Sequence, residues 1–282
     1  MSTVGTFLDE VSIPAPLVLS PDDKLLTAGL MLSHYRASMV VISRQREILG
    51  ALYGYQLLFL FSQIDKNHIY KTLFQTIRES AKILAPESIP TVRLGSSLSE
   101  ILQEIVERRF GDVLVTDDEA QPIGMAGLHE LMQACGVTLE RTNIQVGTVA
   151  SPAKIVDDSM TSGELIKFLF RNRIRRVVVK RTDGLHCADE RSLLKYFFSL
   201  RGLQSIKDEV DDYLNSPIKG FANEETRLMT EIRGTRDVSD AWKLALSSGQ
   251  DSLIVDGEKI ATPWDLVVKP FIQGRLNPRT LH

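Results

Sequence analysis

The segment DVSDAWKLALSSGQDSLIVDGEKIATPWDLV, residues 237–267, decides the fold because it contains one complete structural unit. Apolar residues at helical spacing near its start predict an amphipathic helix: Val238, Ala241, Trp242 and Ala245. Two short apolar runs follow, and the Asp256-Gly257 dipeptide between them is typical of a tight β-hairpin turn. A second apolar helical stretch begins after Thr262. The segment therefore predicts a helix, an antiparallel hairpin and a second helix.

The same order of elements recurs at three other places along the chain. Residues 21–58, 96–132 and 159–197 each show a polar start, a helical apolar stripe, two apolar or β-branched runs and a second helix. The sequence TVGT at 3–6 also recurs as QVGT at 145–148, which indicates two related halves. We therefore expect an α+β (mixed α/β) fold built from four βαββα repeats.

This arrangement resembles the cystathionine-β-synthase (CBS) domain, whose hairpin ends in a Gly-apolar-apolar-Thr/Ser-x-x-Asp signature before the last helix. The resemblance implies a stand-alone protein of four CBS repeats, at about residues 1–64, 85–138, 143–200 and 215–275. CBS repeats pair into Bateman modules, so the resemblance also implies two modules, residues 1–140 and 141–282.

The resemblance has consequences for function. Clefts between paired CBS repeats commonly bind adenosine-containing ligands such as AMP, ADP, ATP or S-adenosylmethionine, and CBS repeats are not themselves catalytic. The resemblance therefore implies a regulatory ligand sensor that binds an adenine nucleotide. It further implies a homodimer formed through the modules and an unidentified protein that the sensor regulates.

Thr262 and Asp265 form the strongest candidate binding pair. Free backbone N–H groups at the start of a helix and a threonine hydroxyl can bind phosphate, and a carboxylate can accept hydrogen bonds from ribose hydroxyls. The same spacing is also typical of a helix cap, with Thr262 at the N-cap, Pro263 next and Asp265 at the third helical position. The equivalent corners lack the Thr/Asp pair; they begin at Tyr53, Gly127 and Asp189. Both interpretations stay open.

The resemblance also assigns weaker roles, for which ordinary turn or core positions are the alternative. Gln250 and Asp251, before the hairpin of repeat four, would meet the edge of an adenine, and Ile232 would pack on the base. Glu130 keeps a carboxylate at the corner of repeat two and would hold a ribose. Arg175 and Arg176 would approach the partner repeat's cleft and bind phosphate.

Two further hypotheses come from other features. The run RNRIRRVVVKR, residues 171–181, carries the densest positive charge, so it is compatible with a nucleic-acid-binding adaptor, although a solvated strand edge explains it equally well. The degenerate corners are compatible with a ligand-free assembly scaffold.

The sequence HCADE at 186–190 has no second ligand pair for a metal, and no P-loop, dinucleotide fingerprint or catalytic triad is recognisable. We therefore predict no catalytic residues, no metal and no cofactor other than a regulatory ligand.

Composition sets the outer limits of these hypotheses. The chain has 282 residues, of which 43% are hydrophobic and 24% charged, as expected of a globular protein of about two domains. Its net charge of −3 excludes a global attraction to nucleic acid or an anionic membrane. The 2 cysteines lie in unrelated contexts and favour a reducing, cytoplasmic location. No apolar run is long enough to predict a transmembrane helix.

Overall fold

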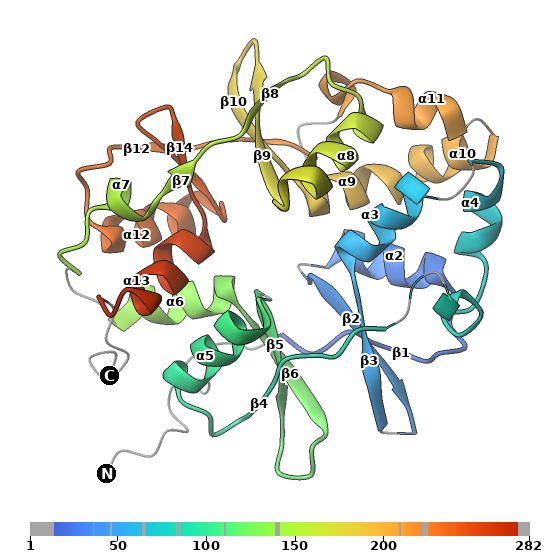
Figure 1. Cartoon of the computed structure of the whole chain (residues 1–282), viewed down its shortest axis with the longest axis horizontal. Coiled ribbons are helices and arrows are strands. Elements are labelled where there is room, and N and C mark those ends of the chain that lie inside the picture. The colour runs from blue at the N-terminus through green and yellow to red at the C-terminus, as the bar shows by residue number, and fades with distance from the viewer. Residues whose placement is uncertain are drawn as a thin grey trace. The chain divides into compact units, whose positions relative to one another are not determined.

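The computed structural model describes residues 14–275 except 36, 46, 64–65, 83, 85, 110, 139–141, 209 and 222–224 (Figure 1). The chain divides into two compact units. Unit 1 consists of Met1–Pro16, Ile89–Ala153 and Met229–His282, and unit 2 consists of Leu17–Ser88 and Lys154–Leu228. Each unit therefore combines segments that lie far apart in the sequence.

Unit 2 contains repeats one and three. The elements of repeat one are β1 (Val18–Leu19), α2 (Leu25–His34), β2 (Met39–Arg44), β3 (Glu47–Tyr53) and α3 (Gly54–Gln63). The elements of repeat three are β8 (Ile155–Asp157), α8 (Ser162–Asn172), β9 (Arg176–Arg181), β10 (Gly184–Asp189) and α9 (Glu190–Phe197). Connecting elements in this unit are α4 (Lys66–Leu73), η1 (Glu79–Lys82), α10 (Leu200–Asp208), α11 (Val210–Asn215), η2 (Ile218–Gly220) and β11 (Arg227–Leu228).

Unit 1 contains repeats two and four. The elements of repeat two are β4 (Thr91–Arg93), α5 (Leu98–Arg108), β5 (Asp112–Thr116), β6 (Pro122–Gly127) and α6 (Leu128–Thr138). The elements of repeat four are β12 (Glu231–Ile232), α12 (Val238–Ser248), β13 (Leu253–Val255), β14 (Lys259–Ala261), the π-helical turn η3 (Trp264–Val268) and α13 (Lys269–Ile272). Unit 1 also contains α7 (Val146–Val149) and β7 (Ser151–Pro152), which follow repeat two in the sequence.

Strand pairing is the same in all four repeats. The first strand of each repeat pairs parallel with the second, across the intervening helix, and the second pairs antiparallel with the third through a hairpin. Two short strands extend the sheets of neighbouring repeats, because β11 adds to β10 and β7 adds to β14. The predicted α+β fold of four βαββα repeats is confirmed.

Local sequence explains where the helices begin. Ser97 and Thr161 precede α5 and α8, and each forms a reciprocal capping box with the glutamate three residues later. These pairs satisfy backbone N–H groups that the first helical turn leaves without partners. The apolar stripes that follow then face the cores, since Ile101 and Leu165 are fully buried.

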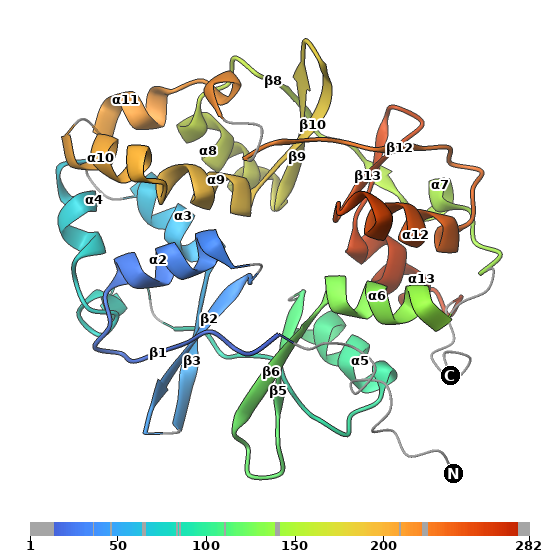
Figure 2. The same ribbon diagram turned by 180° about the vertical axis from the view of Figure 1, so that it is seen from behind.

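Each unit has its own hydrophobic core. In unit 2, helices of repeats one and three pack together, and Phe61 of α3 stacks on Phe197 of α9 with 4.5 Å between ring centroids. In unit 1, α6 packs against α12 and η3, and both views show α6 beside α12 (Figures 1 and 2). The fully buried Trp242 lies in this second core. The cores therefore join repeats one and three, and repeats two and four.

The predicted modules, residues 1–140 and 141–282, group the repeats differently from these units. Their boundary near residue 140 lies outside the described residues, and the pairing of repeats into Bateman modules stays a prediction. In the described part of the chain, no helix combines the length and the apolar character that membrane crossing requires.

Candidate functional site

The corner between β14 and η3 in repeat four brings Thr262 and Asp265 together. Asp265 Oδ2 accepts hydrogen bonds from the backbone N–H of Thr262 at 2.9 Å and from its hydroxyl at 2.7 Å. The backbone N–H of Asp265 lies 3.5 Å from the Thr262 hydroxyl, a long return bond. The helix-cap interpretation of this pair is therefore confirmed, and it leaves Asp265 Oδ1 as the second oxygen that can bind other groups.

A proline explains the unusual turn that follows the corner. Pro270 has no backbone N–H, and its ring is incompatible with a regular α-helical bond to the carbonyl four residues earlier. The chain instead forms a π-helical turn over Trp264–Val268, in which the N–H of Lys269 reaches the carbonyl of Trp264. Such turns often occur at functional sites.

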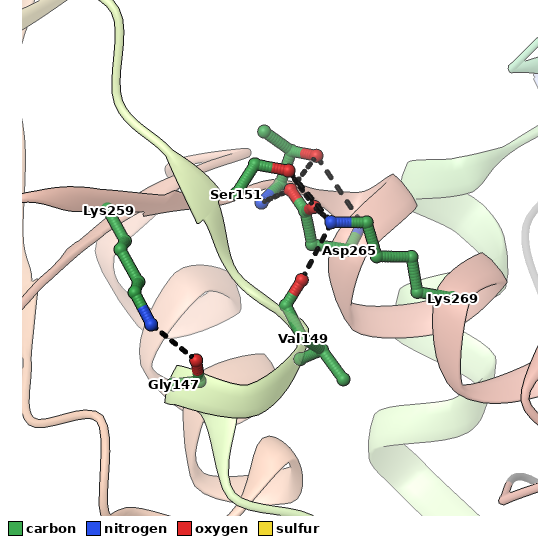
Figure 3. Close-up of polar contacts among 7 residues, drawn as sticks. Gly147, Val149, Ser151, Lys259, Asp265 and Lys269 are labelled. Carbon is green, nitrogen blue, oxygen red and sulfur yellow. Dashed lines mark hydrogen bonds and ion pairs between the residues drawn. The ribbon is translucent and has the colours of Figure 1, made fainter.

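The second oxygen of Asp265 binds two side chains (Figure 3). Ser151, on β7, donates its hydroxyl to Asp265 Oδ1 at 2.7 Å. The ammonium group of Lys269, four residues after Asp265, forms an ion pair with the same oxygen at 2.6 Å. Lys269 Nζ also donates to Ser151 Oγ and to the carbonyl of Val149, both at 2.8 Å. Asp265 is only 2% exposed, so this buried carboxylate is fully surrounded by donors.

Residues 146–153, which we name the strap, supply Ser151 and Val149 to this cluster. The strap comprises α7 and β7 and is held by other contacts as well. Lys259 Nζ donates to the carbonyl of Gly147 at 2.9 Å (Figure 3). The N–H of Gly147 donates to the carbonyl of Gly234, also at 2.9 Å. A side chain at position 147 would press on the backbone of Gly234, so the close approach favours glycine.

All four repeats use the same capping contact at this corner. The backbone N–H of the residue at the strand end donates to the side chain three residues later: Tyr53 to Gln56 at 2.9 Å, Gly127 to Glu130 at 2.9 Å, Asp189 to Ser192 at 3.3 Å and Thr262 to Asp265 at 2.9 Å. The positions that the sequence predicts to be equivalent are therefore equivalent in structure. The ligand role of Thr262 and Asp265 stays a prediction.

The corner of repeat two places the partly buried carboxyl of Glu130 near both Asp112 and His129. Burial raises the pKa of the Glu130 carboxyl above its ordinary value, and the neighbouring Asp112 adds to this effect. A side chain at Gly127 would overlap the carboxylate of Asp112, which explains why this corner has no hydroxyl. The predicted ribose contact of Glu130 stays a prediction.

The corner of repeat one is filled by its own aromatic side chains. Tyr53 is 1% exposed and stacks on Tyr55 with 5.7 Å between ring centroids. Gln56 donates to a carboxylate oxygen of Glu87 at 3.1 Å, and the Tyr55 hydroxyl bonds to the same carboxylate. Burial, followed by this contact with Glu87, raises the pKa of Tyr55 well above its ordinary value. Bulky side chains thus stand where repeat four has a threonine.

The weaker candidates of repeat four have protein partners in unit 1. Gln250 Oε1 accepts from the backbone N–H of Thr230 at 2.9 Å, and a carboxylate oxygen of Asp251 lies 2.9 Å from Nδ1 of His129. Ile232 is 7% exposed and belongs to the core. Strand register places Leu253 opposite Ala261, so the loop before β13 lies at the same sheet end as the corner. The predicted adenine contacts of these residues stay predictions.

Arg175 and Arg176 belong to unit 2. The guanidinium of Arg175 lies 5.9 Å from the centre of the Tyr55 ring. Arg176 lies opposite Asp189 in the strand register of the hairpin of repeat three. Further along the basic run, Arg181 is half-buried and donates to the hydroxyl of Thr226 at 3.0 Å. Part of the positive charge of residues 171–181 therefore has structural partners, and both the phosphate and the nucleic-acid roles stay predictions.

Sequence reasoning missed Ser151 and Lys269. The spacing of Asp265 and Lys269 is a helical ion-pair spacing, so that contact has a local signal. Ser151 is 114 positions from Asp265, and no local pattern connects the two. Among the described residues, no group of three or more His, Cys, Asp or Glu side chains is arranged to hold a metal ion.

Comparison with known proteins adds four findings. The CBS-domain family model matches residues 82–136, which cover most of repeat two. A Methanocaldococcus jannaschii protein proposed as an archaeal homologue of g-AMPK superposes with a TM-score of 0.78 at 13% identity, over 94% of this chain and 99% of that one. An uncharacterized conserved protein from Pyrococcus horikoshii gives a TM-score of 0.54 at 13% identity, over 97% and 99%. No curated protein sequence matches the chain. At such low identity the two structures show a shared fold.

Proposed function

Because the chain is a CBS-domain protein, we propose that it is a non-catalytic sensor that binds an adenosine-containing ligand at the corner of repeat four. The ligand class is AMP, ADP, ATP or S-adenosylmethionine, as the resemblance to CBS domains implies. Binding would change how the protein contacts a regulated partner. The four-repeat fold, shared along nearly the whole chain with the proposed g-AMPK homologue, supports this role over an enzymatic one.

One observation carries the proposal. At the corner of repeat four, a buried carboxylate lies beside a threonine hydroxyl at the start of a helix, and the other three corners lack this pair. Asp265 forms an ion pair with Lys269, and a charged acceptor binds hydroxyl groups more strongly than a neutral one. Backbone N–H groups of the first helical turn offer donors for an anion, whereas the N–H and hydroxyl of Thr262 already donate to Asp265.

The experiment is a binding test with the full chain. Isothermal titration and thermal unfolding would be measured with AMP, ADP, ATP and S-adenosylmethionine, each at up to about millimolar concentration. We expect at least one of them to bind and to raise the unfolding temperature. Absence of binding by all four would reject the proposal.

Variants locate the site. Asp265→Asn should weaken binding at least about tenfold, because a ribose hydroxyl loses its charged acceptor. Asp240→Asn is the matched control, since Asp240 also pairs with a cation four residues away in unit 1 but lies on the exposed face of α12. Equal binding by Asp265→Asn and wild type would place the site elsewhere.

A further inference from the structure

The carboxylate of Asp265 has no acceptor position left. Its two oxygens together accept from four donors in the protein, at distances between 2.6 and 2.9 Å. A carboxylate offers about four lone-pair positions, so a ribose hydroxyl can bind only by replacing one of these donors. The identity of the most replaceable donor then determines the affinity of the site.

The donors differ in how easily they can be replaced. The backbone N–H and hydroxyl of Thr262 belong to the capping pair, and releasing them from Asp265 would take away the acceptor of the Thr262 backbone N–H. Lys269 is the charge partner of a buried carboxylate, and its removal would leave a buried charge uncompensated. Ser151 is neutral, and its hydroxyl leaves Asp265 by rotation about a single side-chain bond.

Ser151 makes the same pair of contacts that a ribose hydroxyl would make. Its oxygen donates to Asp265 Oδ1 at 2.7 Å and accepts from Lys269 Nζ at 2.8 Å. A ribose hydroxyl is likewise one donor and an acceptor, so it can reproduce both bonds without moving the carboxylate or the ammonium group. The hydroxyl of Ser151 therefore already makes the two hydrogen bonds that a ribose hydroxyl would make with Asp265 and Lys269.

The strap does not have to move during this exchange. Its backbone is held independently of the Ser151 side chain, through the contact of Lys259 with the carbonyl of Gly147 at 2.9 Å. The N–H of Ala153 donates to the carbonyl of Glu258 at 3.0 Å, and β7 pairs with β14. Rotation of one hydroxyl group is the smallest change that opens an acceptor on Asp265.

We propose that Ser151 is a built-in competitor that occupies the position of one ribose hydroxyl on Asp265 and so sets the affinity of the site. This inference rests on the proposed function. The structure shows that the competitor is a single side-chain group on β7, so its strength can be changed without altering Thr262 or Asp265.

The test compares two ligands, ATP and 2′,3′-dideoxy-ATP, on the wild type and on Ser151→Ala. We expect ATP to bind Ser151→Ala about five- to tenfold more tightly, since a hydrogen bond to a charged group no longer has to be broken. The dideoxy ligand has no ribose hydroxyls to compete with Ser151, so its affinity should stay the same in both proteins. Ser151→Cys, with a weaker donor, should give an intermediate gain for ATP.

Ser247→Ala is the matched control, because Ser247 also belongs to unit 1 but donates its hydroxyl to the helix carbonyl of Leu244. It should bind ATP as the wild type does. Wild-type binding of ATP with no gain in Ser151→Ala and Ser151→Cys would overturn the competitor role alone. An equal gain for the dideoxy ligand would also overturn it, since the effect would not depend on ribose hydroxyls. Absence of ATP binding in every protein would instead reject the proposed function together with this inference.

Discussion

Replacement of Asp265 by asparagine tests the central cluster without any ligand. The substitution keeps the size of the side chain and removes its charge. The ammonium group of Lys269 then loses its counter-charge, although its side chain is 31% exposed and can reach water. Ser151 and Thr262 lose hydrogen bonds to a charged acceptor and keep, at best, bonds to a neutral one.

The expected cost follows from burial. Removing one partner of a fully buried ion pair typically costs about 3–5 kcal/mol, and the partial exposure of Lys269 reduces this figure. We expect Asp265→Asn to lower the free energy of unfolding by about 2–3 kcal/mol. Lys269→Met should cost a similar amount, because it leaves the buried carboxylate without its charge partner. The double variant should cost about 1–2 kcal/mol less than the sum of the two.

Urea unfolding followed by circular dichroism would measure these free energies. Asp240→Asn is the control, since Arg236 and Asp240 form an ion pair with the same four-residue spacing in the same unit. Their contact is longer than that of Asp265 and Lys269, at 3.5 Å, and both side chains are exposed. Its cost should stay below about 0.5 kcal/mol. Strict additivity of Asp265→Asn and Lys269→Met would refute the reasoning, because it would show that the buried contact carries no interaction energy.

Three further substitutions test other parts of the structure. Glu130→Gln should stabilise the protein at about pH 7.5 but not near pH 4, as urea unfolding at both pH values would show. Burial raises the pKa of Glu130 in the folded protein. The stability that its neutral form contributes is therefore present below the unfolded pKa of about 4.3 and is lost as the pH rises through the folded pKa. Thr161→Ala should lower the free energy of unfolding by about 1 kcal/mol through loss of the α8 cap, and an unchanged urea midpoint would contradict this. Gly29→Ala should cost at least about 1–3 kcal/mol because the new methyl group overlaps the ring of Phe198, whereas Gly95→Ala, at an open position, should change stability by less than about 0.5 kcal/mol in the same assay.

Most of the fold can be predicted from the sequence because its signals are local. The helical stripe from Val238 to Ala245 and the turn at Asp256-Gly257 each depend on a few neighbouring residues, and both elements form as predicted. The association of repeats within a unit has no such signal. The stacking of Phe61 on Phe197 joins residues more than a hundred positions apart. The sequence shows that each residue lies on an apolar helix face, but it does not show that the two faces pack against each other.

The same distinction holds at the site. The Thr262 and Asp265 contact is local, so the spacing of the two residues predicts the cap that the structure shows. The position of Ser151 depends on the pairing of β7 with β14, a contact between segments that are remote in the sequence. The local pattern therefore identifies the corner, and only the tertiary structure shows which donors already occupy it.

The four corners explain how the fold can persist while the sites diverge. The fold requires one acceptor three residues after the strand end, and a glutamine, a glutamate, a serine and an aspartate all supply it. Neutral and acidic side chains both supply this acceptor. The charge and the hydrogen-bonding groups at each corner can therefore differ while the capping contact stays the same. The four corners therefore share one contact without sharing one side chain, and Thr262 with Asp265 is a combination that the cap by itself does not demand. For the same reason, a family model can match residues 82–136 alone while the fold extends over all four repeats.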